Sequence, residues 1–326
     1  MGFRELRDFI ALFLSVTASS VDPNSMSTLA SDGSILKDTQ ARPALPSDTR
    51  DLFPNAAAVN DKSSPVYFLH IPKTAGTTVH NFLTSRFGPE NICPAHLWHQ
   101  LLELAPSRIA GYDFIWGHFY SYLFRHVPVP MRYVTFLRDP VERALSHYGH
   151  IMLYEGHYLH RRAKQLGDFS SYLRDPEMVT TMTNFQVRAL ALDLDPSAIA
   201  STLSAQELAD TELERRLETA VSSASDDEML RISKHRLEQM CFVGITERLD
   251  ESVALLCDKF HWQPPAQIES HNVNGARVRA SQISATDLAL LREMNKADYA
   301  LYEFATRRFA DELDRPASAR RSLVAR

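Results

Sequence analysis

The sequence predicts an α/β fold in which a mostly parallel sheet is flanked by helices on both faces. A hydrophobic strand pattern at Val66–Ile71 is followed by a helical pattern at Thr77–Phe87, and a second strand pattern at Arg132–Leu137 also runs directly into a helix. Further strands are expected at Tyr112–Trp116 and Cys241–Ile245. Strands that alternate with helices are typical of crossovers between parallel strands. Ligands of such sheets bind at the carboxyl ends of the strands, so the residues after each strand are the first site candidates.

The helix that follows Arg132–Leu137 has the clearest start. Asp139 suits the N-cap, Pro140 suits the first helical position, and Glu142 occupies the capping-box position. The remaining helices are expected at Asp168–Arg174, Thr183–Leu192, Ser204–Val221, Glu247–Phe260, and Thr286–Phe309 with a break near Asn295.

Composition and charge limit the classes of function. The chain has 326 residues, of which 44% are hydrophobic and 23% charged, as in a soluble globular protein. The formal net charge of -5 argues against nucleic acid as a partner, because a duplex-binding surface carries a basic excess. Residues 17–64 are rich in Ser, Asp, Pro, Asn and Ala without a helical or strand period. We therefore expect residues 1–64 to form a flexible leader and residues 65–326 to form the folded domain.

The apolar run Phe9–Val16 near the N-terminus is shorter than the roughly 20 residues of a membrane span, so no transmembrane segment is expected. A signal peptide stays open as an alternative, because Arg4 and Arg7 precede the run and small residues follow it. Glu5 and Asp8 argue against that alternative.

The three cysteines, Cys93, Cys241 and Cys257, are too few and too widely spaced for a disulfide framework. This favours a reducing compartment, and we expect a cytoplasmic protein. Cys93 could form a metal site with His96 and His99, but a clear fourth ligand is missing from the segment. We expect no metal.

The run VYFLHIPKTAGTTV (66–79) predicts a strand, a tight loop and a helix start. The first amides of a helix have no partner within it, and the helix dipole places partial positive charge there, which favours an anion. Lys73 adds a full charge and Gly76 lets the backbone approach a ligand, while the threonines supply hydroxyl donors. The alternative is a sharp turn with a solvated lysine. The loop differs from the nucleotide-triphosphate motif G-x-x-x-x-G-K-[ST], because Lys73 precedes the glycine.

The second signal is FLRDPVERALSHY (136–148), where Arg138 lies at a strand end and Ser146 lies eight positions on, inside the capped helix. Together with the Lys73 loop on a neighbouring strand, this segment would place two anion sites on one edge of the sheet. A nucleotide with phosphates at both ends of its ribose needs such a pair.

These motifs resemble the cytosolic and Golgi sulfotransferases, and among them the branch with the heparan sulfate 2-O- and 6-O-sulfotransferases and their bacterial relatives. The segments TNFQVRAL (183–190) and VGITERLDES (243–252) resemble later blocks of that family. The resemblance implies a P-loop-like three-layer core. It also implies that the donor is 3'-phosphoadenosine 5'-phosphosulfate (PAPS), with Arg138 and Ser146 at its 3'-phosphate. The residues implied to grip its 5'-phosphosulfate are Lys73, Thr74, Ala75, Gly76, Thr77 and Thr78.

The resemblance also places His118, in WGHF, in the position of the catalytic base. Transfer of a sulfuryl group to a hydroxyl is an in-line displacement that requires a proton acceptor, and an imidazole suits that task at neutral pH. Lys73 suits the neutralisation of the leaving phosphate. The alternative is a structural histidine at a strand end.

The expected function is therefore transfer of a sulfuryl group from PAPS to a hydroxyl acceptor, expected to be a carbohydrate or a glycolipid. One alternative is a P-loop nucleotide-dependent kinase, which the missing Gly-Lys-Ser/Thr order and the lack of an evident Mg²⁺-binding Asp disfavour. The other is a non-catalytic protein that binds a glycan or a nucleotide, which would be favoured if His118 pointed away from the donor loop.

Two further segments carry charge. Residues 143–167 hold an excess of basic and histidine side chains over the single acid Glu155, and this excess could attract an anionic acceptor or could form a solvated helix face. Glu247 and Arg248 follow the last strand and are expected to form an internal ion pair or to support a loop.

Overall fold

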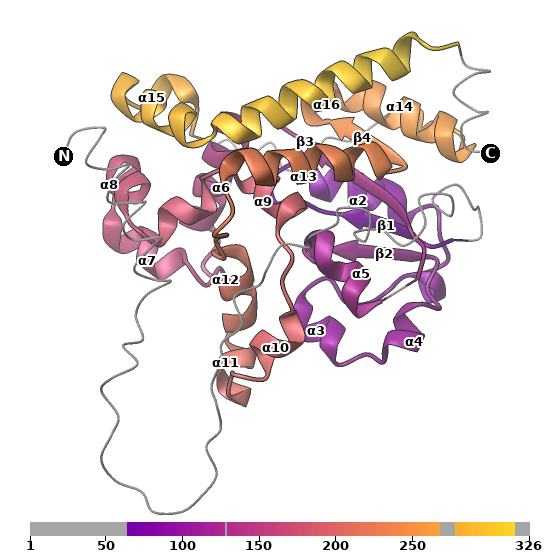
Figure 1. Cartoon of the computed structure of the whole chain (residues 1–326), viewed down its shortest axis with the longest axis horizontal. Coiled ribbons are helices and arrows are strands. Elements are labelled where there is room, and N and C mark those ends of the chain that lie inside the picture. Colours follow the sequence, from indigo (N-terminus) through magenta and orange to yellow (C-terminus); the bar gives the residue numbers. More distant parts are fainter. Residues whose placement is uncertain (1–63, 128, 268–277, 317–326) are drawn as a thin grey trace, which may run out of the picture.

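Within the described part of the chain, four short strands form one parallel sheet in the order β2-β1-β3-β4 (Figure 1). The computed structural model describes residues 64–127, 129–267 and 278–316. The leader expected at residues 1–64, apart from its last residue, and the apolar run Phe9–Val16 lie outside the described residues. The strands are β1 (Val66–Leu69), β2 (Phe114–Gly117), β3 (Arg132–Leu137) and β4 (Phe242–Ile245).

The α/β fold with a parallel sheet is thus as predicted. The chain goes from β1 outward to β2 and then returns to β3 on the other side of β1, so the strand order reverses between β1 and β3. Leu69, the last residue of β1, is level with Gly117 of β2 and Thr135 of β3. A parallel sheet with this reversal offers a ligand crevice at the carboxyl ends of its strands.

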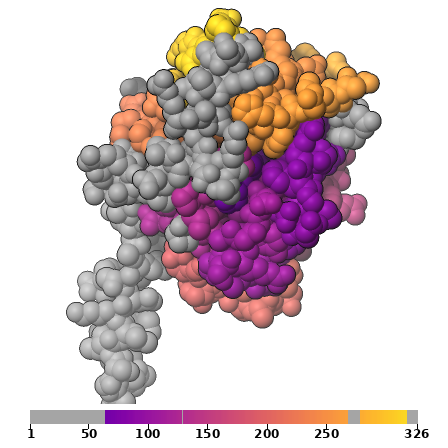
Figure 2. All heavy atoms as spheres, turned by 90° about the vertical axis from the view of Figure 1, so that its right-hand side faces the viewer, coloured from indigo at the N-terminus to yellow at the C-terminus, as the bar shows by residue number. Residues whose placement is uncertain are grey.

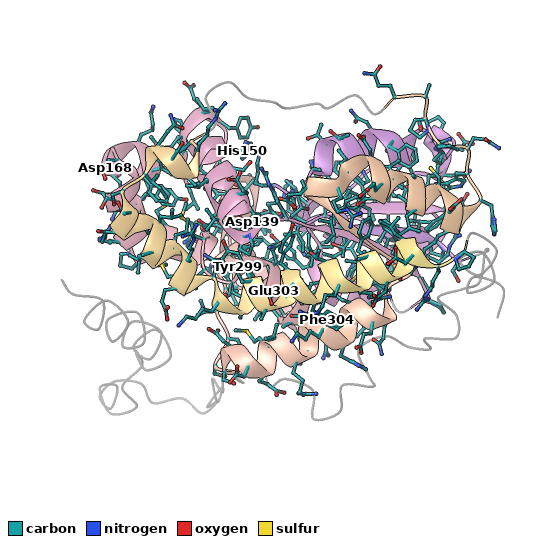
Figure 3. All side chains as sticks on the ribbon, turned by 90° about the horizontal axis from the view of Figure 1, so that it is seen from above. Asp139, His150, Asp168, Tyr299, Glu303 and Phe304 are labelled. Carbon is teal, nitrogen blue, oxygen red and sulfur yellow. The ribbon has the colours of Figure 1, made fainter. Side chains whose placement is uncertain are left out.

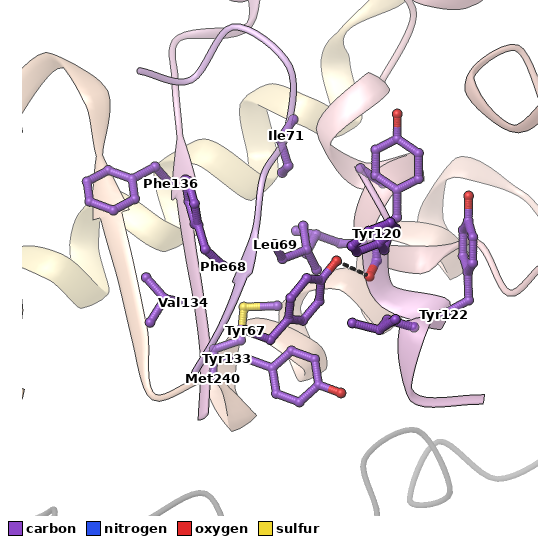
Figure 4. Close-up of a cluster of buried hydrophobic side chains, with 14 of the residues drawn as sticks. Tyr67, Phe68, Leu69, Ile71, Tyr120, Tyr122, Tyr133, Val134, Phe136 and Met240 are labelled. Carbon is purple, nitrogen blue, oxygen red and sulfur yellow. Dashed lines mark hydrogen bonds between the residues drawn. The ribbon is translucent and has the colours of Figure 1, made fainter. Parts of the chain in front are cut away.

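The strands are buried on both faces, which explains why they read as continuous apolar runs rather than alternating ones. Figure 4 shows this core, in which the Tyr67 hydroxyl donates a hydrogen bond to the Tyr120 carbonyl oxygen at 3.0 Å. Phe68 meets Phe136 edge to face. The hydrogen bond from Tyr67 connects β1 to the segment after β2, so the core fixes the relative position of two strand ends.

Helices follow three of the strands and flank the sheet: α2 (Gly76–Thr84) after β1, α6 (Pro140–Leu153) after β3, and α14 (Leu249–Phe260) after β4. The cap predicted for α6 is present, because Asp139 Oδ1 accepts a hydrogen bond from the Glu142 N–H at 3.0 Å. The helix α16 (Lys296–Asp314) packs on β4 with α14 (Figure 1). In the space-filling view the indigo segment that begins at residue 64 lies against the orange α14 region (Figure 2). Trp262, two residues after α14, contacts the rings of Phe82 and Phe87.

The predicted helices were partly wrong in extent. The helix expected at Ser204–Val221 is two helices, α11 (Ala205–Ala209) and α12 (Glu212–Glu218), because Thr211 adopts a left-handed conformation with φ of 60°. The expected break near Asn295 is present between α15 (Ala285–Met294) and α16. The other α-helices in the described part of the chain are α3 (Trp98–Leu102), α4 (Pro106–Ile109), α5 (Leu123–His126), α7 (His160–Leu166), α8 (Phe169–Arg174), α9 (Phe185–Ala191), α10 (Pro196–Ala200) and α13 (Asp226–Gln239).

The sequence prediction missed α13, a helix of 14 residues. Its segment is dominated by charged side chains, so the apolar signal is weak, and part of its buried face is formed by Ser233 and Arg236 rather than by apolar residues. Ser225 does provide an N-cap by accepting from the Glu228 N–H. Among the described residues, no helix is both long and apolar enough to cross a bilayer.

Candidate active site

A cavity of about 500 Å³ opens at the carboxyl end of the sheet, next to the point where the strand order reverses. The loops after β1 and β2, the helix α6 with the turn that follows it, and α12 form its walls. Its lining residues include Lys73, Ala75, Gly76, Thr77, His118, Arg138, Ser146, His147, His150, Tyr154, His157, Tyr158, Glu214 and Glu218. Two loops and one helix predicted to converge at this edge therefore share one cavity.

The loop after β1 makes two unusual backbone turns. Lys73 and Ala75 have φ values of 73° and 64°, a left-handed conformation that residues with a Cβ rarely adopt. Ala75 is the N-cap of α2 and no side chain caps the helix. The loop therefore presents Lys73 and the positive end of the α2 dipole to the cavity.

Two residues predicted to bind the donor, Thr74 and Thr78, do not line the cavity. The Thr74 hydroxyl donates to the Ile71 carbonyl oxygen at 2.9 Å, which stabilises the turn itself. Thr78 is buried in the first turn of α2. Neither lines the cavity within the described chain, whereas Lys73, Ala75 and Thr77 do.

Arg138 lies beside the loop, as its strand-end position predicted. Its Nη1 donates to the Lys73 carbonyl oxygen at 2.9 Å, so the two cationic residues are held together by a direct bond. Burial, with Arg138 and Arg143 nearby, lowers the pKa of Lys73 to about 8. The α2 loop and the end of β3 thus form a region that a bound anion would stabilise.

Long-range contacts hold the end of β3 in place. Gln186 of α9 accepts from the Arg138 N–H at 3.0 Å and donates to the Arg138 carbonyl oxygen at 2.8 Å. Glu247 accepts from the Asp139 N–H at 3.1 Å and from the Tyr302 hydroxyl at 2.8 Å. Glu247 therefore supports the loop, as predicted, while Arg248, the residue before α14, pairs with Glu251 of that helix.

Ser146 lies on α6 and lines the same cavity as Arg138. Figure 3 shows Asp139 and His150 near the two ends of this helix, so α6 extends from the Arg138 end of the cavity toward the wall formed by His150. The predicted pair of anion-binding segments is thus assembled on one surface.

His118 lines the cavity and does not point away from the donor loop. Its Nδ1 lies 3.1 Å from the His70 carbonyl oxygen, and a carbonyl can only accept, so Nδ1 carries the proton. In the neutral ring the lone pair is consequently on Nε2. Burial lowers the pKa of His118 below its ordinary value, which favours this neutral form near pH 7.

Gly117 is required for the position of His118. Its φ of 149° lies in the region open to glycine, and a Cβ there would be 2.5 Å from the His96 carbonyl oxygen. That same carbonyl accepts from the His118 N–H at 3.1 Å. The glycine therefore lets the backbone of the His96 segment approach closely enough to fix His118.

The sequence reasoning missed His70, which follows β1 and precedes the loop. Its ring lies 4.5 Å from the His118 ring, centroid to centroid, and its carbonyl orients His118. A Cβ at Gly76 would lie 1.6 Å from His70 Nε2. Gly76 was expected to let a ligand approach, and in the structure it also makes room for this ring.

We expect Gly76→Ala to destabilise the fold by about 1–3 kcal/mol, because the added methyl group must displace His70 or α2. The matched control is Gly149→Ala on α6, where a Cβ would meet nothing within 4 Å. That control should gain about 0.5–1 kcal/mol, since alanine is the better residue in a helix interior. Urea unfolding of both variants measures the difference, and equal stabilities would contradict the assigned role of Gly76.

Cys93, His96 and His99, the candidate metal ligands in the sequence, do not come together in the structure. His99 Nδ1 bonds Glu214 at 2.8 Å, His96 lines the cavity, and Cys93 is buried in the core. Among the described residues, the group that could hold an ion is His147, His157 and Glu218. His157 Nδ1 accepts from the Leu159 N–H at 3.1 Å, so its Nε2 carries the proton in the neutral ring and cannot donate a lone pair to a metal.

The basic segment 143–167 divides into two parts. His147, His150 and His157 line the cavity, where burial lowers the pKa of His150 and of His157 to about 4 and keeps both neutral near pH 7. Arg161 and Lys164 are exposed on α7 and lie outside the lining. Only α7 therefore forms the solvated, basic helix face that was one of the two alternatives for this segment. The three histidines bring no positive charge to the cavity.

Comparisons with known proteins identify the family of the chain. The model of the sulfotransferase family matches residues 56–305. The zebrafish (Danio rerio) heparan-sulfate 6-O-sulfotransferase 2 is 25% identical over 281 residues, covering 74% of this chain. This chain spans 57% of the length of that relative. A family match over most of the chain, together with the strand-end loop, Arg138 and Ser146 around one cavity, leads to one conclusion: the chain belongs to the sulfotransferase family.

Proposed function

We propose that the protein transfers a sulfuryl group from PAPS to a hydroxyl group of a carbohydrate or glycolipid. The observation that carries the proposal is the shared cavity, in which the Lys73 loop, Arg138 and His118 meet. The glycan acceptor is supported by the zebrafish relative, which is a heparan-sulfate sulfotransferase.

The residues of the cavity fit the donor. Lys73 and the start of α2 supply positive charge for the 5'-phosphosulfate, and Arg138 with Ser146 supplies donors for the 3'-phosphate. A volume of about 500 Å³ is in the range of small-molecule sites. The Arg138–Lys73 hydrogen bond couples the two phosphate-binding segments, so both ends of one nucleotide can be recognised together.

The chemistry follows from the positions of these groups. The acceptor oxygen forms a bond to sulfur while the bond from sulfur to the phosphate oxygen breaks, and the electron pair of that bond leaves with the phosphate. His118 Nε2 accepts the hydroxyl proton. Lys73 offsets the charge that develops on the leaving phosphate.

The test is incubation of the protein with ³⁵S-labelled PAPS and a panel of neutral and acidic glycans, glycolipids and phenols. We expect labelled product and release of 3'-phosphoadenosine 5'-phosphate (PAP), with no need for added Mg²⁺. A parallel arm with γ-labelled ATP and Mg²⁺ distinguishes the kinase alternative. Label transferred only in the ATP arm would contradict the proposal.

We expect Arg138→Ala to weaken PAP binding by roughly tenfold to a hundredfold, because a charge-assisted contact contributes about 1.5–3 kcal/mol. The loss for adenosine 5'-phosphosulfate, which lacks the 3'-phosphate, should be much smaller. Isothermal titration of both nucleotides measures this difference. Equal losses would mean that Arg138 only supports the loop through its bond to the Lys73 carbonyl oxygen.

A further inference from the structure

The α12 wall of the cavity contains acidic residues. Glu214 and Glu218 both come from α12 and both line the cavity. Among the lining residues the full charges are these two carboxylates and the two cations Lys73 and Arg138. Since the cations are assigned to the phosphates of the donor, the acceptor would meet the carboxylates.

The same wall offers carboxylate oxygens without hydrogen-bond partners. Glu218 is 8% exposed, and Glu218 Oε1 forms no hydrogen bond within the described chain. Its approach to His147 Nε2, at 3.0 Å, does not have hydrogen-bond geometry. Glu214 Oε1 accepts from His99, while its Oε2 is likewise unpartnered. Buried polar atoms in this state are stabilised by a ligand that can donate hydrogen bonds to them.

An aromatic surface lies at the rim. Tyr154 is 56% exposed yet lines the cavity, and its ring stacks on His150 with centroids 5.4 Å apart. The Tyr158 hydroxyl, also in the lining, is buried and unpartnered. Ligand sites are commonly lined by aromatic side chains, so the exposed Tyr154 ring is available to pack on a bound ligand. A sugar ring combines a face of C–H groups, which packs on such rings, with hydroxyls that both donate and accept hydrogen bonds.

We propose that the acceptor is an uncharged sugar, a neutral glycan or the neutral headgroup of a glycolipid, bound between Tyr154 and the carboxylates Glu214 and Glu218, and not an acidic polysaccharide. The inference rests on the sulfuryl transfer proposed above and specifies its acceptor. The sugar hydroxyls would donate to the two carboxylates, and the ring would pack on Tyr154.

An acidic acceptor would meet an unfavourable environment. Burial lowers the pKa of every histidine in the lining, so these rings do not offset its charge. Burial already raises the pKa of Glu218, so a second negative charge nearby would either be repelled or force Glu218 to take up a proton. Arg143 is buried on α6 and does not line the cavity, and its charge interacts with both Asp298 and Glu218. The exposed cations of α7 are outside the cavity.

The test compares one polysaccharide in two charge states: a glucuronic-acid polymer and the same polymer after methyl esterification of its carboxylates. Binding to the full-length protein in saturating PAP, and sulfation with labelled PAPS, are measured for both. We expect the ester to bind at least about tenfold more tightly, as for removal of a like charge near a partly buried one. In the double variant Glu214→Gln and Glu218→Gln, the preference for the ester over the acidic polymer should become smaller. The affinity of this variant for PAP shows whether it is folded.

Two matched controls accompany the test. Glu238→Gln, an exposed change on α13 that removes one of the two negative charges lost in the double variant, should leave the preference unaltered. Tyr154→Ala should raise the KM of the neutral acceptor by roughly two- to tenfold, whereas Leu153→Ala, equally exposed but outside the lining, should not.

Equal or tighter binding of the acidic polymer would overturn the inference, and so would failure of the ester to bind. The proposed function fails separately. If the ester binds more tightly but neither polymer nor any other acceptor receives label, the preference for an uncharged sugar is supported. Sulfuryl transfer is then contradicted.

Discussion

His118→Ala should lower turnover with PAPS and a glycan acceptor by roughly a hundredfold to ten-thousandfold, the usual contribution of a general base. Its affinity for PAP should change little, because the phosphate contacts are assigned to the Lys73 loop, Arg138 and Ser146. The physical reason is the fixed tautomer: the bond from Nδ1–H to the His70 carbonyl oxygen leaves Nε2 as the proton acceptor. Single-turnover rates and PAP titrations measure the two effects separately.

The pH dependence gives a second readout of the same residue. Only neutral imidazole accepts a proton, so the parent rate should rise with pH through the pKa of His118. Because burial lowers that pKa below its ordinary value, the rise should lie below pH 6.5 and should be absent in the variant. His235→Ala, a partly exposed histidine on α13, is the control and should keep the parent profile. Comparable turnover of His118→Ala and the parent would remove His118 from the mechanism.

The parts of the site that the sequence predicted depend on local signals. The strand-loop-helix run that ends β1 carries the turn residues and the basic residue in one short stretch. The Asp139 cap and the eight-residue spacing of Arg138 and Ser146 likewise lie within one strand end and one helix. The parallel sheet then brings both segments to one edge, because the carboxyl ends of parallel strands coincide.

The parts that could not be predicted depend on contacts between distant segments. Glu214 and Glu218 lie on a short charged helix that the sequence predicts only as part of a longer one. Nothing in their local sequence indicates that α12 faces the cavity. The space beside Gly76 is filled by His70, and only the structure reveals this contact. The donation of the Thr74 hydroxyl to its own turn is a further detail that a count of hydroxyls does not reveal.

A buried network explains why the C-terminal helices matter for the site. Asp298 of α16 accepts from the N–H groups of Gln186 and Val187, at 3.0 and 2.7 Å. It therefore caps α9, because the side chain of the N-cap residue Asn184 makes no capping bond to that helix. The Gln186 side chain in turn holds the backbone of Arg138. The position of Arg138, which is predicted to bind the 3'-phosphate, therefore depends on the carboxylate of Asp298, 160 residues further along the chain.

Lys73→Gln should lower kcat/KM for PAPS by roughly a hundredfold to a thousandfold, the effect of removing one group that stabilises developing charge. Arg138 and the α2 dipole remain in the variant, so PAP binding should persist at reduced affinity. Lys296→Gln on α16, an exposed lysine paired with Glu293, is the charge-matched control and should behave as the parent.

The pH dependence should also identify Lys73. Its pKa of about 8 belongs to the free protein, so kcat/KM for PAPS should fall as pH rises through about 8, when the ammonium loses its proton. Bound phosphosulfate stabilises the charged ammonium and raises its pKa, so kcat at saturating donor should not fall until higher pH. In Lys73→Gln, kcat/KM should no longer decrease as the pH rises through about 8. The increase of the rate with pH in the acidic range, which is due to His118, should remain. An unchanged alkaline limb in the variant would show that another group titrates there and that the Lys73 charge is not required for donor capture.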